Sequence, residues 1–295
     1  MKKIGVIDLG SNSARLTVAE IIGDDFNTVF SDNIYVRLAE GMTDSSNTLK
    51  PEPALRAVLA LSEFIKKCGD LSCDEVSVIA TEAVRRADNS EWFLSLVKSA
   101  VGVDIDVISG SDEAYYDCLS IMHKTGFREF VMIDTGGGST EIAYVNGGEV
   151  KNRVSAPWGS VVLNRMFSSG ETLSPKEFND VIAHISDGFA SLDWIFGIKN
   201  VPIIMLGGSL RNWYDYKKDY TLSQFADKML SMTVSEREDF GIPKRRSDTI
   251  TAGLAPAIVL ELIIKPSEIT ACDCGVKAEV ICSIGKKAEE LFGGF

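Results

Sequence analysis

Residues 4–16 read IGVIDLGSNSARL, and residues 130–142 read FVMIDTGGGSTEI. Both stretches contain the pattern Ile-Asp-x-Gly-x-x-Ser, with an apolar run before it and residues that favour β-strands after it. When the two stretches are aligned on this pattern, all matched positions keep one constant offset, so that Asp8 falls on Asp134. The offset has the size of a domain rather than that of a short solenoid repeat. The chain is therefore predicted to contain two copies of one folding unit.

The composition is typical of a globular protein and argues against several classes of partner. The chain has 295 residues, of which 45% are hydrophobic and 24% are charged. At roughly 150 residues per domain, this length accommodates two domains. We find neither a charged-then-apolar leader nor an apolar run near the ~20 residues of a membrane span, so we expect a cytoplasmic protein with no membrane partner. The formal net charge of −12 argues against nucleic-acid binding, which requires a basic face.

The cysteines fit a reducing compartment better than a disulfide scaffold, because six are too few for a chain of this length. The stretch CDCGVKAEVIC at 272–282 lacks the paired spacing of a zinc site. We therefore expect buried, inert thiols. The six residues are Cys68, Cys73, Cys118, Cys272, Cys274 and Cys282.

The apolar patterning predicts the element order βββαβαβα in both copies, with an insertion in the second. In the first copy we expect strands at 3–8, 13–22, about 26–37, 76–81 and 103–109, and helices at 51–69, 89–102 and 111–125. In the second copy we expect strands at 130–134, 139–145, 149–155, 202–206 and 268–272, and helices at 174–197, within 209–231 and 247–264, and from about 275.

Capping residues indicate where several of these helices begin or end. Ser174 followed by Glu177 is the pattern of a capping box at a helix N-terminus. Asn89 or Ser90 is expected to begin another helix, and Gly69 is suited to cap the C-terminus of the helix before it.

Two such units that face one another define the ribonuclease-H-like, actin-like architecture shared by sugar kinases and heat-shock chaperones. We therefore predict an α/β fold of two facing ribonuclease-H-like domains with a cleft between them. The first domain is expected at 1–124 and the second at 125–295. The last helix, at about 275–293, is expected to pack back on the first domain.

The glycine-rich turns of the two repeats are predicted to bind phosphate. A strand, a glycine turn and a second strand expose backbone N–H groups in a concave row that suits phosphate oxygens, and glycines allow a close approach. A single turn of this kind is usually only a tight hairpin, but its repetition favours a shared chemical role. The residues assigned to phosphate in these turns are Gly10, Ser11, Asn12, Ser13, Gly136, Gly137, Gly138, Ser139 and Thr140.

A carboxylate precedes each turn, Asp8 in the first copy and Asp134 in the second, although strands disfavour Asp. Paired carboxylates near phosphate commonly hold Mg²⁺, with waters completing its shell. The copies then differ, because Arg15 in the first stands where the second has Glu141. We expect the first hairpin, with Arg15 as a phosphate ligand, to grip anions and the second to hold a cation. A solvated strand position is the alternative for each of these two residues.

Four segments resemble the exopolyphosphatase and guanosine pentaphosphate phosphohydrolase (Ppx/GppA) family of the actin-like superfamily. DLGSNSARL at 8–16 matches the first phosphate loop of that family, and DTGGGSTE at 134–141 matches the second. ATEAVRRADN at 80–89 matches its Ala-Thr-Ser-Ala-x-Arg segment, and SGSDEA at 109–114 matches its Ser-Gly-x-x-Glu-Ala helix start. The resemblance covers nearly the whole chain, and the combination is more specific than any single segment.

The resemblance implies roles for residues that the repeat alone does not single out. It implies that Glu113 is the catalytic base, that Asp134 and Glu141 bind the metal, and that Arg85 with Thr81 binds phosphate. The alternatives are a helix-dipole partner for Glu113 and a surface ion pair for Arg85.

Weaker matches and departures complete the comparison. LGGSLR at 206–211 and RRSDTITAG at 245–253 match less well, and the first adds Gly207 and Gly208 to the phosphate-binding set. Glu82 replaces a small Ser that is usual in the family. The longer members carry a further C-terminal helical module, which we expect this chain, with only two histidines, to lack.

A second departure lies near the C-terminus, where GVKAEVI stands in place of the usual Gly-Leu-Arg-Glu-Gly. Whether Lys277 substitutes for the Arg stays open, because an ammonium cannot reproduce the planar fork of a guanidinium.

The resemblance implies a hydrolase dependent on Mg²⁺ or Mn²⁺ that releases terminal phosphate from inorganic polyphosphate, guanosine pentaphosphate or both. Two rivals stay open, an actin-like kinase or ATPase and a nucleotide-binding switch or filament subunit. A kinase would need an acceptor site in addition to both phosphate loops. The expected partners are the substrate and a second copy of the chain in a homodimer. The sequence does not rank the two substrates.

Overall fold

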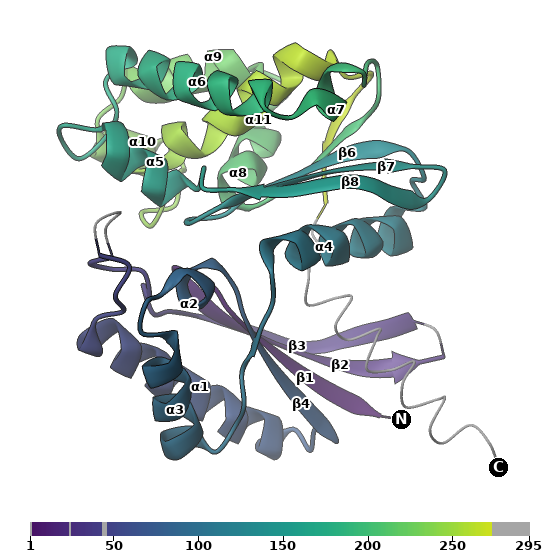
Figure 1. The fold of residues 1–295 in the computed structure, drawn as a ribbon, viewed down its shortest axis with the longest axis vertical. Coiled ribbons are helices and arrows are strands. Elements are labelled where there is room, and N and C mark those ends of the chain that lie inside the picture. The colour runs from purple at the N-terminus through teal and green to yellow at the C-terminus, as the bar shows by residue number, and fades with distance from the viewer. Residues whose placement is uncertain (1, 24, 43–45, 273–295) are drawn as a thin grey trace. The chain divides into compact units, whose positions relative to one another are not determined.

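The computed structural model describes residues 2–23, 25–42 and 46–272 (Figure 1). Its contacts divide the chain into two compact units, the first ending at Ser120 and the second beginning at Ile121. The predicted domain boundary at residue 124 stays a prediction. The predicted last helix at about 275–293 and the segment around Lys277 lie outside the described residues.

Each unit contains a five-stranded sheet, and the two sheets have the same strand order. The first sheet runs β3-β2-β1-β4-β5, with β1 (Lys3–Leu9), β2 (Ser13–Ile22), β3 (Asp25–Tyr35), β4 (Glu75–Ala80) and β5 (Asp106–Val107). The second runs β8-β7-β6-β9-β10, with β6 (Phe130–Thr135), β7 (Thr140–Asn146), β8 (Glu149–Ala156), β9 (Ile203–Leu206) and β10 (Ile269–Ala271). The predicted duplication is therefore present in the order of the strands.

The pairing pattern is also shared. In each unit the first three strands form antiparallel hairpins, and the last two join the sheet in parallel with the first. The central strand of each sheet is apolar along most of its length, as expected for a strand with neighbours on both edges and cover on both faces. The edge strand β8 instead alternates between exposed and partly buried side chains.

The helices of the first unit are α1 (Pro51–Asp70), α2 (Glu82–Arg86), α3 (Ser90–Val101) and the start of α4 (Gly110–Thr125), within which the chain passes into the second unit. Helix α1 buries one face, with Ala57, Leu61 and Phe64 spaced by three or four residues. It packs against β1, β2 and α3, and α1 and α3 lie side by side in Figure 1.

One predicted cap in this unit is wrong, and one predicted helix start is confirmed with an unexpected use of its side chain. Helix α1 continues past Gly69 to Asp70, and Leu71 takes the capping position. Asn89 precedes α3 as expected, but its side chain does not cap that helix. Its amide instead accepts from the backbone N–H of Leu49 at 2.9 Å and donates to the carbonyl of the same residue at 3.1 Å. The Asn89 side chain therefore bonds to the backbone of Leu49 rather than to the N-terminus of α3.

The second unit is built around a buried helix. Helix α11 (Ile250–Ile264) is apolar on almost every side, which is the pattern of a helix surrounded by protein. It packs against α5 (Ser160–Phe167), α6 (Pro175–Ala190), α8 (Gly208–Tyr216) and α9 (Leu222–Leu230), and these helices lie on one side of the β6-β7-β8 hairpins in Figure 1. The short helices α7 (Asp193–Phe196) and α10 (Val234–Asp239) complete the unit. The predicted helical stretches within 209–231 correspond to α8 and α9.

None of the helices within residues 2–23, 25–42 and 46–272 is both long enough and apolar enough to cross a lipid bilayer.

The capping box at the start of α6 gives a test of the local fold. Ser174 accepts from the N–H of Glu177 at 3.3 Å, and the Glu177 carboxylate accepts from the N–H of Ser174 at 2.7 Å. We expect Ser174→Ala to destabilise the second unit by about 1 kcal/mol, since a backbone donor loses its partner. The shift in the midpoint of urea denaturation measures this change.

Ser186→Ala, on an exposed face of the same helix, is the matched control, and a shift within about 0.5 kcal/mol is expected there. Equal shifts for the two variants would contradict a specific role of the cap.

Candidate functional site

The glycine turns of the two units are closed by the same backbone hydrogen bond. In the first glycine loop, residues 10–13, the N–H of Gly10 donates to the carbonyl of Ser13 at 2.9 Å. In the second glycine loop, residues 136–139, the N–H of Gly136 donates to the carbonyl of Ser139 at 3.0 Å. The repeated sequence pattern therefore corresponds to a repeated backbone geometry.

The carbonyls of the second loop are anchored at the N-terminus of α5. Gly136 O accepts from Ser160 N–H at 2.9 Å, and Gly137 O accepts from Val161 N–H at 3.0 Å. A trans peptide group holds its N–H and C=O on opposite sides. The N–H groups of Gly137 and Gly138 are therefore directed away from α5, as a row of donors for an anion requires.

The first loop is anchored in an equivalent way by the segment that follows β3. Ser11 O accepts from Ala39 N–H at 3.0 Å, and Asn12 O accepts from Arg37 N–H at 2.9 Å. By the same reasoning, the N–H groups of Asn12 and Ser13 are directed away from that segment. Each unit thus presents backbone donors from its predicted phosphate loop.

The second loop also requires a glycine from outside the predicted set. A Cβ atom on Gly159, the residue that precedes α5, would overlap the backbone of Gly137 and Gly138. Sequence reasoning did not identify this residue, because strands β7 and β8 separate it in the chain from the loop that it contacts. Thr140, at the start of β7, bonds to the segment before α5, since its hydroxyl donates to the Trp158 carbonyl at 2.9 Å.

The carboxylates of the second unit lie opposite one another. Asp134 and Glu141 are cross-strand neighbours of β6 and β7, so their side chains leave the same face of the sheet. Glu141 is 2% exposed, and Ser155 Oγ donates to its Oε1 at 2.6 Å. Like charges placed directly opposite each other are destabilising unless a cation or hydrogen bonds compensate. Carboxylate oxygens in this arrangement suit a hard cation such as Mg²⁺.

The first unit replaces this arrangement by an opposite-charge pair, since Asp8 lies across from Arg15 in the β1-β2 register. The predicted difference between Arg15 and Glu141 means that the residue across from the loop carboxylate is basic in the first unit and acidic in the second. Within the described ranges, no three His, Cys, Asp or Glu side chains form a metal-binding group. A cation held by Asp134 and Glu141 would need oxygens from water or a ligand to complete its shell.

The predicted residue Gly207 lies beside Asp134, and the predicted residue Gly208 follows it as the first residue of α8. Gly207 has a φ of +84°, and a Cβ atom there would lie 2.5 Å from the Thr135 carbonyl oxygen and 2.7 Å from Asp134 Oδ1. Only glycine permits this approach. The N-terminus of a nine-residue helix, which favours anions, is thereby placed against the loop carboxylate.

Arg246 is a basic residue of this region to which the sequence analysis assigned no role. Its guanidinium lies against Gly208, and its Nη1 donates to Asn212 Oδ1 at 3.5 Å. The segment that carries it is held by the fully buried Arg237, which donates from Nε to the Met229 carbonyl at 2.8 Å and from Nη1 to the Ser247 carbonyl at 2.7 Å. Burial lowers the pKa of Arg237. The weak match of RRSDTITAG was the only sequence signal for this position.

In the first unit, the parallel strands β1, β4 and β5 end at the same edge of the sheet, which is where ligands usually bind in such sheets. Thr81 follows β4 and donates its N–H to the Leu9 carbonyl at 3.3 Å, next to the first loop. Ile108 follows β5 and donates its N–H to the Ala80 carbonyl at 3.1 Å. Thr81 and the helix that carries Glu113 are thereby brought to the edge that holds Asp8.

Arg85 and Glu113, to which the resemblance gives separate roles, meet at this edge. Arg85 Nη1 lies 3.4 Å from Glu113 Oε2 and donates to the Ile108 carbonyl at 2.7 Å. The shorter contact is with Glu82, whose Oε2 accepts from Arg85 Nη2 at 2.7 Å. All three side chains are about one-fifth exposed, so a ligand can reach the cluster from one side. Glu82 occupies a donor of Arg85 that an anionic ligand would use.

Comparison with known proteins shows the family and the fold of the chain. A sequence model of the Ppx/GppA phosphatase family matches residues 17–288. The chain belongs to the Ppx/GppA phosphatase family. It is 28% identical over 279 residues to the guanosine-5'-triphosphate,3'-diphosphate pyrophosphatase of Vibrio atlanticus (strain LGP32). That alignment covers 90% of this chain and 55% of the relative, so the chain spans about half the length of the curated relatives it matches.

Solved structures of Ppx/GppA proteins share the fold. The Aquifex aeolicus PPX-GPPA enzyme superimposes with a TM-score of 0.80 at 24% identity, covering 96% of this chain and 99% of that one. An exopolyphosphatase from Cytophaga hutchinsonii gives a TM-score of 0.86 at 19% identity, covering 97% and 98%. The predicted α/β, two-domain, actin-like fold is confirmed.

The contact between Glu82 and Arg85 gives a testable expectation for this Ppx/GppA chain. Glu82→Gln keeps the shape of the side chain but removes the charge that holds the guanidinium. We expect inorganic pyrophosphate to bind about fivefold more tightly, because the ligand no longer displaces a carboxylate worth roughly 1 kcal/mol. Isothermal titration calorimetry measures the affinity.

Glu52→Gln is the matched control, because Glu52 pairs with Arg56 in the same unit at 3.2 Å and is distant in sequence from the loops. Unchanged or weaker binding by Glu82→Gln would show that Glu82 positions Arg85 rather than competing for it.

Proposed function

We propose that the chain hydrolyses phosphoanhydride bonds and releases terminal phosphate from inorganic polyphosphate, guanosine pentaphosphate or both. The observation that carries the proposal is the cluster of Arg85 and Glu113 at the sheet edge that also holds the first glycine loop. The cluster pairs an anion-binding guanidinium with a carboxylate that can act on water. The relative from Vibrio atlanticus, named a guanosine-5'-triphosphate,3'-diphosphate pyrophosphatase, supports the same reaction class.

The first unit binds phosphate and supplies the base in this proposal. The N–H groups of the first glycine loop, with Arg15, Thr81 and Arg85, hold phosphate oxygens, and a guanidinium can engage two of them at once. Since Glu113 Oε2 lies 3.4 Å from Arg85 Nη1, an oxygen held by Arg85 is within reach of a water that Glu113 orients. Glu113 accepts the proton of that water as it attacks phosphorus.

The second unit has phosphate donors and a cation site of its own in this proposal. The second glycine loop with Ser139 and Thr140, and the α8 N-terminus with Gly207 and Gly208, present hydrogen-bond donors. Asp134 and Glu141 would hold Mg²⁺ or Mn²⁺, and a bound cation would neutralise charge on the phosphate oxygens. Asp8 is proposed as a further metal ligand because it occupies the position of Asp134 in the repeat.

The rate enhancement in this proposal comes from position and charge rather than from a covalent intermediate. The anhydride already contains a good leaving group, so the chain has to align the water, the phosphorus and the departing oxygen. Fixed backbone donors stabilise the charge that spreads over the transferring group, and they need no reorganisation during the reaction.

The assay that tests the proposal measures phosphate release from polyphosphates of several lengths and from guanosine pentaphosphate, each with and without Mg²⁺. Release without an acceptor supports hydrolysis over a kinase. Absence of release from every substrate, together with concentration-dependent polymerisation, would favour a filament subunit instead. Homodimer formation and a cytoplasmic location stay predictions.

Replacing Glu113 by Gln tests the proposed base. The variant keeps the shape of the side chain but cannot accept a proton, so we expect kcat to fall by ~10²–10⁴ with KM nearly unchanged. Steady-state phosphate release measures both constants.

Asp112→Asn, one residue away, is the control, because Asp112 is held by the Ser109 hydroxyl at 2.7 Å at the start of the same helix. A Glu113→Gln variant within about threefold of the wild-type kcat would remove this residue from the role of general base.

Replacing Asp134 by Asn tests the proposed cation site. A neutral amide oxygen is a poorer ligand for a hard cation than a carboxylate, so the Mg²⁺ concentration for half-maximal activity should rise. Binding of Mn²⁺, followed by electron paramagnetic resonance, gives a second readout that is independent of turnover. Asp8→Asn should act in the same direction but less strongly.

Glu149→Gln is the control on the same sheet, where the carboxylate is exposed and paired with Lys151. A Mg²⁺ titration of Asp134→Asn that overlays the wild-type curve would rule out Asp134 as a metal ligand.

A further inference from the structure

Two cysteines of the first unit lie at the two ends of one helix-terminating motif. Helix α1 ends with two nested hydrogen bonds, from Cys73 N–H to the Cys68 carbonyl and from Ser72 N–H to the Gly69 carbonyl, both 2.9 Å long. Ser72 has a φ of +55°, in the left-handed region. These bonds and this conformation define a Schellman motif. The left-handed position is therefore taken by Ser72, three residues after the predicted glycine cap.

The motif places the side chains of its first and last residues in contact, usually as an apolar pair. Here both residues are cysteines, and the Cys68 thiol hydrogen-bonds to the sulfur of Cys73. Both sulfurs also lie over Gly5 of β1, where a Cβ atom would be 2.7 Å from Cys68 Sγ and 3.6 Å from Cys73 Sγ. The two sulfurs thus share one small space that Gly5 leaves open.

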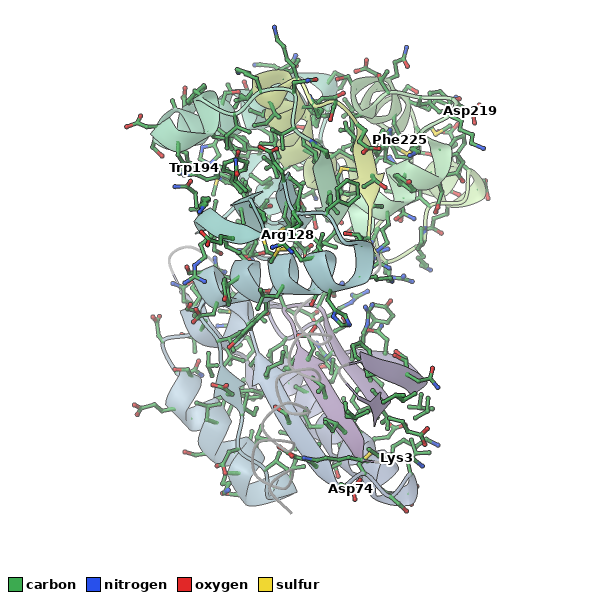
Figure 2. All side chains as sticks on the ribbon, turned by 90° about the vertical axis from the view of Figure 1, so that its right-hand side faces the viewer. Lys3, Asp74, Arg128, Trp194, Asp219 and Phe225 are labelled. Atoms are coloured by element: carbon green, nitrogen blue, oxygen red, sulfur yellow. The ribbon has the colours of Figure 1, made fainter. Side chains whose placement is uncertain are left out.

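The backbone around the pair is held on both sides. Asp74 N–H donates to the Lys3 carbonyl at 2.8 Å, and Lys3 N–H donates to Asp74 Oδ2 at 2.7 Å. Figure 2 shows Lys3 and Asp74 next to one another at this end of the sheet. Because Cys73 is the residue before Asp74, its position relative to Cys68 is fixed by β1 as well as by the helix motif.

The two thiols differ in exposure and in acidity. Cys68 is 1% exposed, whereas Cys73 is partly exposed. Burial raises the pKa of Cys68 to about 12, and Cys73 adds to this shift. Burial also raises the pKa of Cys73, with Asp74 acting in the same direction, but the hydrogen bond from Cys68 and the charge of Lys3 oppose it. Cys73 is therefore the more accessible nucleophile of the pair.

We propose that Cys68 and Cys73 are a dithiol pair that closes to an intramolecular disulfide by exchange with a low-molecular-weight disulfide. The Cys73 thiolate attacks one sulfur of the oxidant, which forms a mixed disulfide and releases one small thiol. The Cys68 thiolate then attacks Cys73 Sγ and releases the second small thiol. The protein loses two electrons and two protons, and the oxidant is reduced to two thiols, which take up both.

The geometry favours the second step, attack of Cys68 on Cys73 Sγ, over persistence of the mixed disulfide. The helix motif already holds the two residues in contact, so the effective concentration of Cys68 at the mixed disulfide is high. The raised pKa values make the first step slow at neutral pH and faster in base, since only the thiolate reacts. The pair is thus protected against brief exposure to an oxidant and responds to a sustained one.

The test treats the intact protein with oxidised glutathione at pH 7 and pH 9, alkylates the remaining thiols and analyses the tryptic peptides by mass spectrometry. We expect the peptide that contains both cysteines to lose two hydrogen atoms and to escape alkylation, with full reversal by dithiothreitol. The reaction should be at least tenfold faster at pH 9, because the thiolate fraction rises about tenfold per pH unit below the pKa.

Three single variants sharpen the outcome. Cys68→Ser should accumulate glutathione on Cys73, Cys73→Ser should leave Cys68 unmodified, and Cys118→Ser, which removes a buried thiol of α4, should behave as wild type. A mixed disulfide that persists on Cys73 in the wild-type protein would overturn the proposal. So would the absence of any reaction at pH 9 while the urea-unfolded protein reacts.

Discussion

Each unit ends its central strand in a short loop that one backbone hydrogen bond closes, from Gly10 to Ser13 in the first unit and from Gly136 to Ser139 in the second. The positions of the candidate site residues depend on this closure. It fixes which residues face one another across the hairpin, and it leaves the loop carbonyls in reach of neighbouring backbone donors. Once those carbonyls are engaged, the planarity of the peptide group directs the following N–H groups outward.

The same backbone carries two different electrostatic arrangements. Opposite Asp8 the first hairpin places Arg15, so the residue across from this loop carboxylate carries the opposite charge. Opposite Asp134 the second hairpin places a buried carboxylate, and the resulting repulsion can be relieved by a cation. The two units share the backbone frame, and the residue at the equivalent position of the neighbouring strand, Arg15 or Glu141, makes them differ in charge.

The local features were the ones that the sequence could predict. The three strands that open each unit, the two hairpins and the Ser174 capping box follow from patterns in short stretches of sequence, and the structure confirms them. The sequence did not predict the use of Asn89 by Leu49, because that bond joins segments forty residues apart. Positions such as Gly159 and Arg246 depend on contacts between distant segments in the same way. The roles assigned to the site residues come from resemblance and stay proposals.

The buried Arg237 has a consequence for how this protein tolerates change. Its guanidinium spans two carbonyls from different segments, and one of them belongs to the turn that carries Arg246. A lysine could not reach both acceptors, because an ammonium lacks the rigid fork of a guanidinium. Position 237 is therefore constrained by these two carbonyls, although Arg237 is not one of the candidate site residues. In the second unit, a residue that holds the backbone behind a site can therefore be sensitive to substitution, as the residues of the site are.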